Sequence, residues 1–125
     1  MITKVNVDTK VKEEIKTEFK DARFTCCDYS YNGKFLVTGG DDYKVRFWDD
    51  ETTTMIVESD SFYTKHNAHS NRVFCSKFLP NDENVAVTAG WDMNIILHDQ
   101  RQQGPVGALY GPLVVGEGLT FWGEN

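Results

Sequence analysis

Histidines and cysteines are the side chains of this sequence best suited to bind a metal or to act as nucleophiles. His66 and His69 lie in a polar stretch, and His98 follows an apolar run. Zinc sites join such side chains at short, regular spacings. The cysteines instead lie inside apolar, strand-like segments, at spacings that do not fit zinc. We therefore predict that the chain binds no metal.

The cysteines are also placed for packing. Cys26 and Cys75 lie 49 residues apart, at matching positions of two similar segments. Cys27 follows Cys26 directly, and neighbouring side chains of a strand point to opposite faces. A thiolate nucleophile needs a nearby base or cation, and the sequence offers no convergent set of such residues. We predict no catalytic residue, no cofactor and no enzymatic activity.

Acidic residues gather around one predicted turn. Asp41 and Asp42 follow Gly39 and Gly40, and residues 49–51 form a second group. A calcium loop needs oxygen ligands at alternating positions, which this cluster lacks. The two glycines also lack the GxxxxGK pattern of a phosphate-binding loop. The cluster therefore indicates turn chemistry and a solvated surface.

These residues belong to a repeated pattern. Residues 34–49 read KFLVTGGDDYKVRFWD, and residues 84–99 read NVAVTAGWDMNIILHD. Each has an apolar run, a turn with Gly and Asp, and a second run with alternating apolar positions, which is typical of a β-hairpin. Four pairs match at an offset of 50, namely Thr38 with Thr88, Gly40 with Gly90, Asp42 with Asp92, and Asp49 with Asp99. A recurrence across a whole hairpin predicts a repeat architecture.

Further short β-type segments flank the two hairpins. In the first unit they are residues 23–29 and 52–58, and in the second unit they are residues 73–78 and 106–110. Each unit is therefore expected to form four strands joined by tight turns. Residues 119–121 resemble the first strand of a third unit.

The N-terminal stretch leaves two interpretations open. Residues 5–8 and 13–19 fit a pair of strands in the register of the repeat. Val11, Ile15 and Phe19 also fall at the spacing of an amphipathic helix over residues 11–20.

Composition excludes some classes of protein. The 125 residues include 13 basic and 19 acidic side chains, for a net charge of −6. A nucleic-acid binder needs an excess of Lys and Arg to neutralise phosphates. No apolar run reaches the length of a signal peptide or a membrane span. We expect an intracellular, cytoplasmic protein with reduced cysteines, no nucleic-acid partner and no membrane insertion.

The repeated hairpins resemble the WD-repeat β-propeller family, whose blades are four-stranded antiparallel sheets. The resemblance implies an all-β fold, a partial β-propeller with too few blades to close alone. It divides the chain into a third-and-fourth-strand hairpin of a preceding blade (residues 1–20), two blades (residues 21–60 and 61–110) and the first strand of a truncated following blade (residues 111–125).

The resemblance also implies a network that holds each blade. In the family, a His before the first strand, a Ser or Thr on the second, an Asp in the next turn and a Trp on the third hydrogen-bond one another. The matching residues are Thr38, Asp42 and Trp48 in the first unit, and His69, Thr88 and Asp92 in the second. Lys20 stands in place of the His in the first unit, and His98 in place of the Trp in the second.

The rim of the propeller often binds partner peptides in this family. The resemblance places Arg23 and Asp41 of the first unit on that rim, with Arg72 and Trp91 of the second. Exposed Trp and Arg are frequent binding hot spots. The alternative is that Trp91 only packs over its neighbouring loop.

The number of blades implies other protein chains. The sequence accounts for about 2.75 blades, whereas closed rings have roughly four to eight. Apolar end faces of a few hundred Å² would leave on the order of 10 kcal/mol unrealised. We therefore expect a fragment of a longer propeller or a chain completed by partners, and not a free monomer. The expected function is a protein-interaction scaffold; the alternative is a structural subunit of a large assembly, such as a cytoskeletal or ciliary one.

Overall fold

The computed structural model describes residues 2–5, 12–15, 23–59, 68–111, 113–114, 116 and 118–122. Within these ranges the regular structure is entirely β, so the predicted all-β class is confirmed. The described part of the chain has no helix with the length and hydropathy that crossing a bilayer requires.

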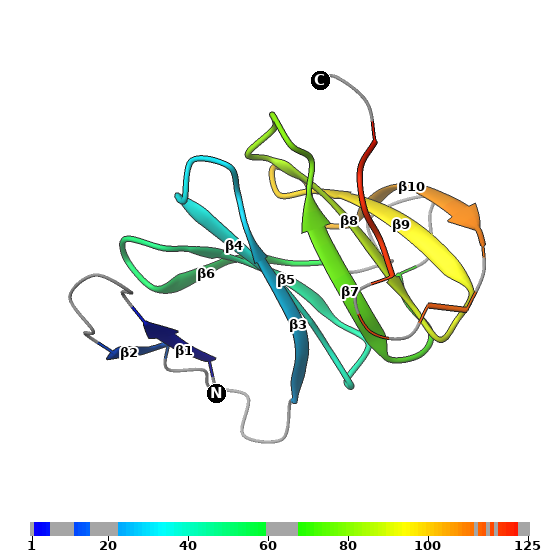
Figure 1. Cartoon of the computed structure of the whole chain (residues 1–125), viewed down its shortest axis with the longest axis horizontal. Helices are drawn as coiled ribbons and strands as arrows, with labels where there is room; N and C mark the ends of the chain where they lie inside the picture. Colours follow the sequence, from blue (N-terminus) through cyan, green and yellow to red (C-terminus); the bar gives the residue numbers. More distant parts are fainter. Residues whose placement is uncertain are drawn as a thin grey trace.

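Two four-stranded antiparallel sheets follow each other along the chain (Figure 1). Blade one consists of β3 (Phe24–Tyr29), β4 (Phe35–Gly40), β5 (Val45–Asp49) and β6 (Thr54–Glu58), paired in sequence order. Blade two consists of β7 (Val73–Phe78), β8 (Val85–Gly90), β9 (Asn94–Asp99) and β10 (Pro105–Tyr110), also paired in sequence order. The two sheets form an unclosed arc, as expected for a partial propeller.

The repeated aspartates fix equivalent turns between the second and third strands of each blade. Asp42 Oδ1 accepts a hydrogen bond from the Lys44 N–H at 3.2 Å, and Asp92 Oδ1 accepts one from the Asn94 N–H at 3.1 Å. The residue between each pair has a positive φ, 71° at Tyr43 and 62° at Met93. A carboxylate that bonds the backbone two residues on stabilises this tight turn, which explains the recurrence of Asp.

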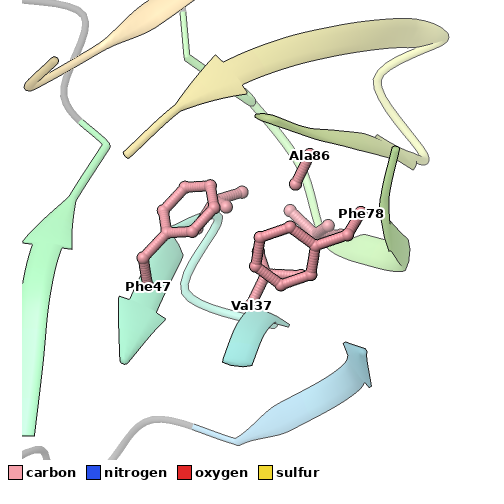
Figure 2. Close-up of a cluster of buried hydrophobic side chains, with 6 residues drawn as sticks. Val37, Phe47, Phe78 and Ala86 are labelled. Atoms are coloured by element: carbon pink, nitrogen blue, oxygen red, sulfur yellow. The ribbon is translucent and has the colours of Figure 1, made fainter. Parts of the chain in front are cut away.

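The main hydrophobic core lies between the two blades. Val37 and Phe47 of blade one face Phe78 and Ala86 of blade two, and all four are buried (Figure 2). The rings of Phe47 and Phe78 meet edge to face, with centroids 5.8 Å apart. Alternation along each strand directs these side chains to the shared face.

The first strands of the two blades, β3 and β7, lie side by side in the middle of the molecule (Figure 1). The Phe78 N–H donates to Asp28 Oδ2 at 2.9 Å across this contact. A Cβ at Gly39 would lie 2.5 Å from Val73 Cγ1, so only glycine fits there without displacing β7. Thr25 Oγ1 also donates to the carbonyl oxygen of Val73.

The expectation of bare apolar end faces is wrong for the centres of both faces. Leu36 and Trp48, on the face of blade one that points away from blade two, are each 2% exposed. On the opposite end of the arc, Cys75 and Ala89 of blade two are buried together with Val114. The chain after β10 therefore contributes to covering blade two.

Residues 119–121 do not form the strand that the repeat predicted. Leu119 packs against the cluster of Cys75, Ala89 and Val114 instead. A strand needs a neighbour with which to pair, and among the described residues the pairing of blade two ends with its own four strands.

The N-terminal stretch contains an antiparallel pair, β1 (Ile2–Val5) and β2 (Lys12–Ile15). The helical alternative for residues 11–20 is therefore wrong at residues 12–15. The remainder of the two predicted strands, including Asp8, lies outside the described residues, as does Lys20. The assignment of this hairpin to a preceding blade stays a prediction.

Candidate functional site

Blade two contains a buried chain of polar side chains. His69 Nδ1 lies 2.8 Å from Asp92 Oδ2, and His69 Nε2 lies 2.7 Å from Thr88 Oγ1. The same hydroxyl lies 2.8 Å from His98 Nε2. The His69 and Asp92 side chains are 0% and 1% exposed. The structure thus brings His69, Thr88 and Asp92 together, and His98 takes up the place beside Thr88.

This series of hydrogen-bonded side chains continues beyond blade two. His98 Nδ1 lies 2.9 Å from the hydroxyl of Ser59, which directly follows β6 of blade one. The Ser59 N–H also donates to the Val45 carbonyl at 2.8 Å, which fixes the residue against blade one. The repeat pattern gave no signal for this contact, because Ser59 lies between the two repeated units.

Burial strongly affects the protonation states of the ionisable side chains in this network. Burial, and to a lesser degree the neighbouring His69, lower the pKa of His98 from 6.5 to about 3. Burial also lowers the pKa of His69, against the pull of the Asp92 carboxylate. For Asp92, burial acts to raise the pKa, but His69 and the N–H groups of Ser70 and Asn94 hold it below its usual value. Near pH 7 both imidazoles are therefore neutral and Asp92 is ionised.

Blade one uses a different set of contacts. The indole N–H of Trp48 donates to Thr38 Oγ1 at 2.9 Å. Asp42 Oδ2 accepts from Arg46 Nη2 at 2.6 Å, and Arg46 Nε donates to Glu58 at 2.9 Å. Among the described residues of blade one, the side chains of Thr38 and Asp42 are thus not joined through a histidine; Thr38 contacts the Trp48 indole, and Asp42 contacts the Arg46 guanidinium. Arg46 was missed in the sequence, although a charged residue between the apolar Val45 and Phe47 is a signal that could have found it.

The four predicted rim residues form two equivalent pairs. On blade one the Arg23 N–H donates to Asp41 Oδ1 at 3.1 Å, and the Asp41 N–H donates to the Arg23 carbonyl at 3.0 Å. On blade two the Trp91 N–H donates to the Arg72 carbonyl, also at 3.0 Å. Gly90 precedes this contact, and a Cβ there would lie 2.1 Å from the Arg72 carbonyl oxygen.

Trp91 is partly packed and partly exposed. Its ring lies 4.9 Å from that of Phe74, and the Arg72 guanidinium carbon lies 5.7 Å from the Trp91 ring centre. The residue nevertheless keeps 40% of its surface exposed. It therefore packs over its neighbourhood and still presents an indole to solvent.

The structure adds two apolar residues to this part of blade two. Met93 follows Trp91 in the same turn and is exposed, and Tyr110 at the end of β10 is 78% exposed. The Tyr110 hydroxyl donates to the Met93 sulfur at 3.5 Å. Sequence reasoning missed both, because the pairing of β10 with β9 brings them together. We call Arg72, Trp91, Met93 and Tyr110 the blade-two rim.

The described residues hold no group of three or more His, Cys, Asp or Glu side chains arranged to bind a metal ion. The two histidines inside blade two have their ring nitrogens committed to hydrogen bonds with Asp92, Thr88 and Ser59. This arrangement holds strands together and presents no polar group to a substrate.

Two repeats of one family account for these features. The family described as WD domain, G-beta repeat matches residues 13–49 and 60–99, and the chain belongs to it. Each matched segment includes the first three strands of one blade. Proteins of this family generally act as non-catalytic scaffolds that bind other proteins.

Two individual proteins can be compared with the chain. The transcriptional corepressor LEUNIG_HOMOLOG of Arabidopsis thaliana is 32% identical over 83 residues, 66% of this chain and 10% of that protein. The chain thus spans about a tenth of the length of this relative. A chain in the crystal structure of the mitotic checkpoint complex superposes with a TM-score of 0.71 at 21% identity. That match covers 86% of this chain and 30% of the other, and it shows a shared fold.

Proposed function

We propose that the chain is part of a protein-interaction scaffold and that it binds a partner protein through the blade-two rim. The observation that carries this proposal is Trp91, a large aromatic residue with 40% of its surface exposed beside the Arg72 guanidinium. Rigid aromatic side chains next to Arg are the residues that contribute most often to binding energy.

The setting of Trp91 favours binding over simple packing. Phe74 fixes one face of the ring, so little side-chain entropy is lost when a partner covers the rest. Met93, in the same turn as Trp91, and Tyr110 are further exposed residues with large apolar surfaces. The family's general role as a scaffold and the assembly named in the structural match support the same function.

Replacement of Trp91 tests the proposal. We expect Trp91→Ala to weaken a peptide ligand, selected from a display library on the wild-type chain, about 30-fold, which corresponds to about 2 kcal/mol. Trp122 is 97% exposed and lies outside the rim, so Trp122→Ala is the matched control and should bind as the wild type does. Titration calorimetry measures the affinities, and urea unfolding measures the stability of each variant.

Unchanged affinity of Trp91→Ala together with lower stability would show that the indole serves packing alone. Equal losses for both tryptophan variants would show that the selected peptide binds elsewhere. Either result contradicts a binding role for the blade-two rim.

A structural role in a larger assembly is the second candidate. It is favoured by the arc itself, because blade one and blade two form no closed ring. Light scattering on the purified chain tests it: self-association or capture of a completing chain supports it, and a stable monomer contradicts it. The thiols of Cys26 and Cys75 form no disulfide, which supports an intracellular location for either function.

A further inference from the structure

We propose that Ser59, His98, Thr88, His69 and Asp92 form one directional hydrogen-bond chain that clasps blade one to blade two and is destabilised when His98 is protonated. The four links measure 2.9, 2.8, 2.7 and 2.8 Å in that order. We call this set the inter-blade clasp.

The direction of every hydrogen bond in the clasp follows from Asp92. Its carboxylate accepts the N–H groups of Ser70 at 3.0 Å and Asn94 at 3.1 Å, and an ionised carboxylate can only accept. His69 Nδ1 must therefore donate, which leaves its Nε2 to accept from the hydroxyl of Thr88. That hydroxyl oxygen then accepts from His98 Nε2.

The last link joins the blades. Because Nε2 of His98 donates to Thr88, Nδ1 carries the lone pair and accepts the hydroxyl proton of Ser59. With both rings neutral, each of the four ring nitrogens and each of the two hydroxyl hydrogens takes part in one hydrogen bond of the chain. A buried network that is fully satisfied in one arrangement specifies the packing of the elements that contribute to it.

The imidazole at position 98 is what makes the clasp. In blade one the equivalent residue, Trp48, has a single N–H, and its hydrogen bond ends at Thr38. An indole offers no second nitrogen. His98 does, and its second nitrogen reaches a residue 39 positions earlier that belongs to the end of blade one.

Protonation disturbs this link. A proton on His98 Nδ1 turns that nitrogen from acceptor to donor, so the hydrogen bond with the Ser59 hydroxyl must reverse. It also places a charge beside His69, whose ring centre lies 6.3 Å away. The nearby carboxylates are already engaged: Asp99 with Arg101, and Glu58 with Arg46 and Lys44. Asp92 lies beyond His69 and Thr88 in the chain. The new charge is thus buried without a counter-ion, which is costly.

The pH range of the effect follows from the sign of the shift. The pKa of His98 is about 3 in the folded chain, against 6.5 for the ordinary side chain. A lowered histidine pKa means that the unfolded chain binds the proton more readily, so the stabilisation is fully present above about pH 6.5. It decreases as the pH falls from there towards 3, by up to tenfold in the unfolding equilibrium constant per pH unit.

Two variants and a control test the clasp in the full chain. Ser59→Ala removes the link and should raise the unfolding constant at pH 7.5 about fivefold. His98→Gln retains an acceptor for Ser59 and a donor for Thr88 but does not titrate. Below pH 6.5 its unfolding constant should therefore rise less steeply with falling pH than that of the wild type, by about a factor of ten per pH unit. Ser70→Ala is the matched control, because Ser70 is exposed and contributes only its backbone N–H.

Nitrogen NMR of the imidazoles provides a readout that a purely structural role would not give. We expect His98 to carry its proton on Nε2 and to remain neutral between pH 8 and pH 5, with the Nδ1 resonance moved in Ser59→Ala and unmoved in Ser70→Ala. A proton on Nδ1 contradicts the proposal, as does a titration midpoint near 6.5 in the folded chain. Equal stabilities of the two serine variants would also contradict it.

Discussion

Thr88 shows how much can depend on a single hydroxyl. It lies between two imidazole nitrogens at 2.7 and 2.8 Å and is fully buried. Thr38, its equivalent in blade one, contacts only the indole nitrogen of Trp48 and, at 3.5 Å, the Arg46 carbonyl. The two repeats thus place the same residue type in networks of different size.

Replacement of the two threonines should therefore have unequal effects. Thr88→Val keeps the shape but leaves both His69 and His98 with an unpaired nitrogen, and we expect it to cost about 3 kcal/mol of unfolding free energy. Thr38→Val leaves one indole N–H without an acceptor and should cost about 1.5 kcal/mol of unfolding free energy. Urea unfolding at pH 7.5 measures both. Losses of the same size would show that the hydrogen bonds of Thr88 contribute no more than those of Thr38.

The contacts of individual residues could be predicted from the sequence only where those residues occupy a position of the repeat pattern. Thr88, Asp92 and His69 fall in the family pattern, whose register the hairpins define. Ser59 lies between the repeats, and Arg46 corresponds to the apolar Ile96 in blade two, so no register pointed to their contacts. Buried polar contacts between distant segments depend on how the blades pack, which no local pattern encodes.

The strands themselves were easier to predict than their contacts. The two hairpins predicted from the repeat correspond to the strand pairs β4–β5 and β8–β9. They could be predicted because alternating apolar residues and Gly/Asp turns encode them locally. Residues 119–121 have the same kind of composition but no strand to pair with in the described chain. Strand propensity alone does not make a strand when the neighbour is missing.

The contact between β4 and β7 leads to a prediction about these elements. Gly39→Ala would place a Cβ 2.5 Å from Val73 Cγ1, and the stiff branched side chain can yield little, so we expect a loss of about 2 kcal/mol. Gly107 is the control, since a Cβ there meets Leu97 at an ordinary 3.8 Å. Thermal and urea unfolding compare Gly39→Ala with Gly107→Ala.

A second-site change shows whether the clash is the cause. Val73→Ala removes Cγ1, the nearest atom that the new methyl would meet, while Cys26 Sγ at 2.7 Å and Val73 Cβ at 2.9 Å remain. The double variant should therefore lose somewhat less than the sum of the two single variants. Additive losses would show that the contact with Val73 Cγ1 is not the cause of the destabilisation.

At the scale of the whole molecule, the segment after β10 covers the outer face of blade two. Val114 is 6% exposed and packs with Cys75 and Ala89, and its N–H donates to the Gly90 carbonyl at 3.3 Å. The incomplete ring was predictable from the number of repeats. That the chain covers its own end face was not, because residues 113–118 carry no repeat pattern that assigns them a place.

Charge at position 114 tests this cover. Val114→Asp should cost about 3 kcal/mol and uncover the apolar face of blade two, so light scattering should show self-association that rises with concentration. The adjacent Leu113 is exposed, and Leu113→Asp should leave stability and mass unchanged. A monomeric, fully stable Val114→Asp would show that the segment does not protect blade two.

The outer edge strands of the two blades differ in whether they carry charged residues. At the end of β6, Glu58 forms salt bridges with Lys44 and Arg46, so this edge strand carries charged side chains. The other outer strand, β10, carries no charged residue from Pro105 to Tyr110 and ends in the exposed Leu109 and Tyr110. Charged edges discourage lateral pairing between sheets, and uncharged apolar ones invite it. Fibre-like stacking of this chain would accordingly begin at β10, and a lysine at position 109 is the change most suited to suppress it.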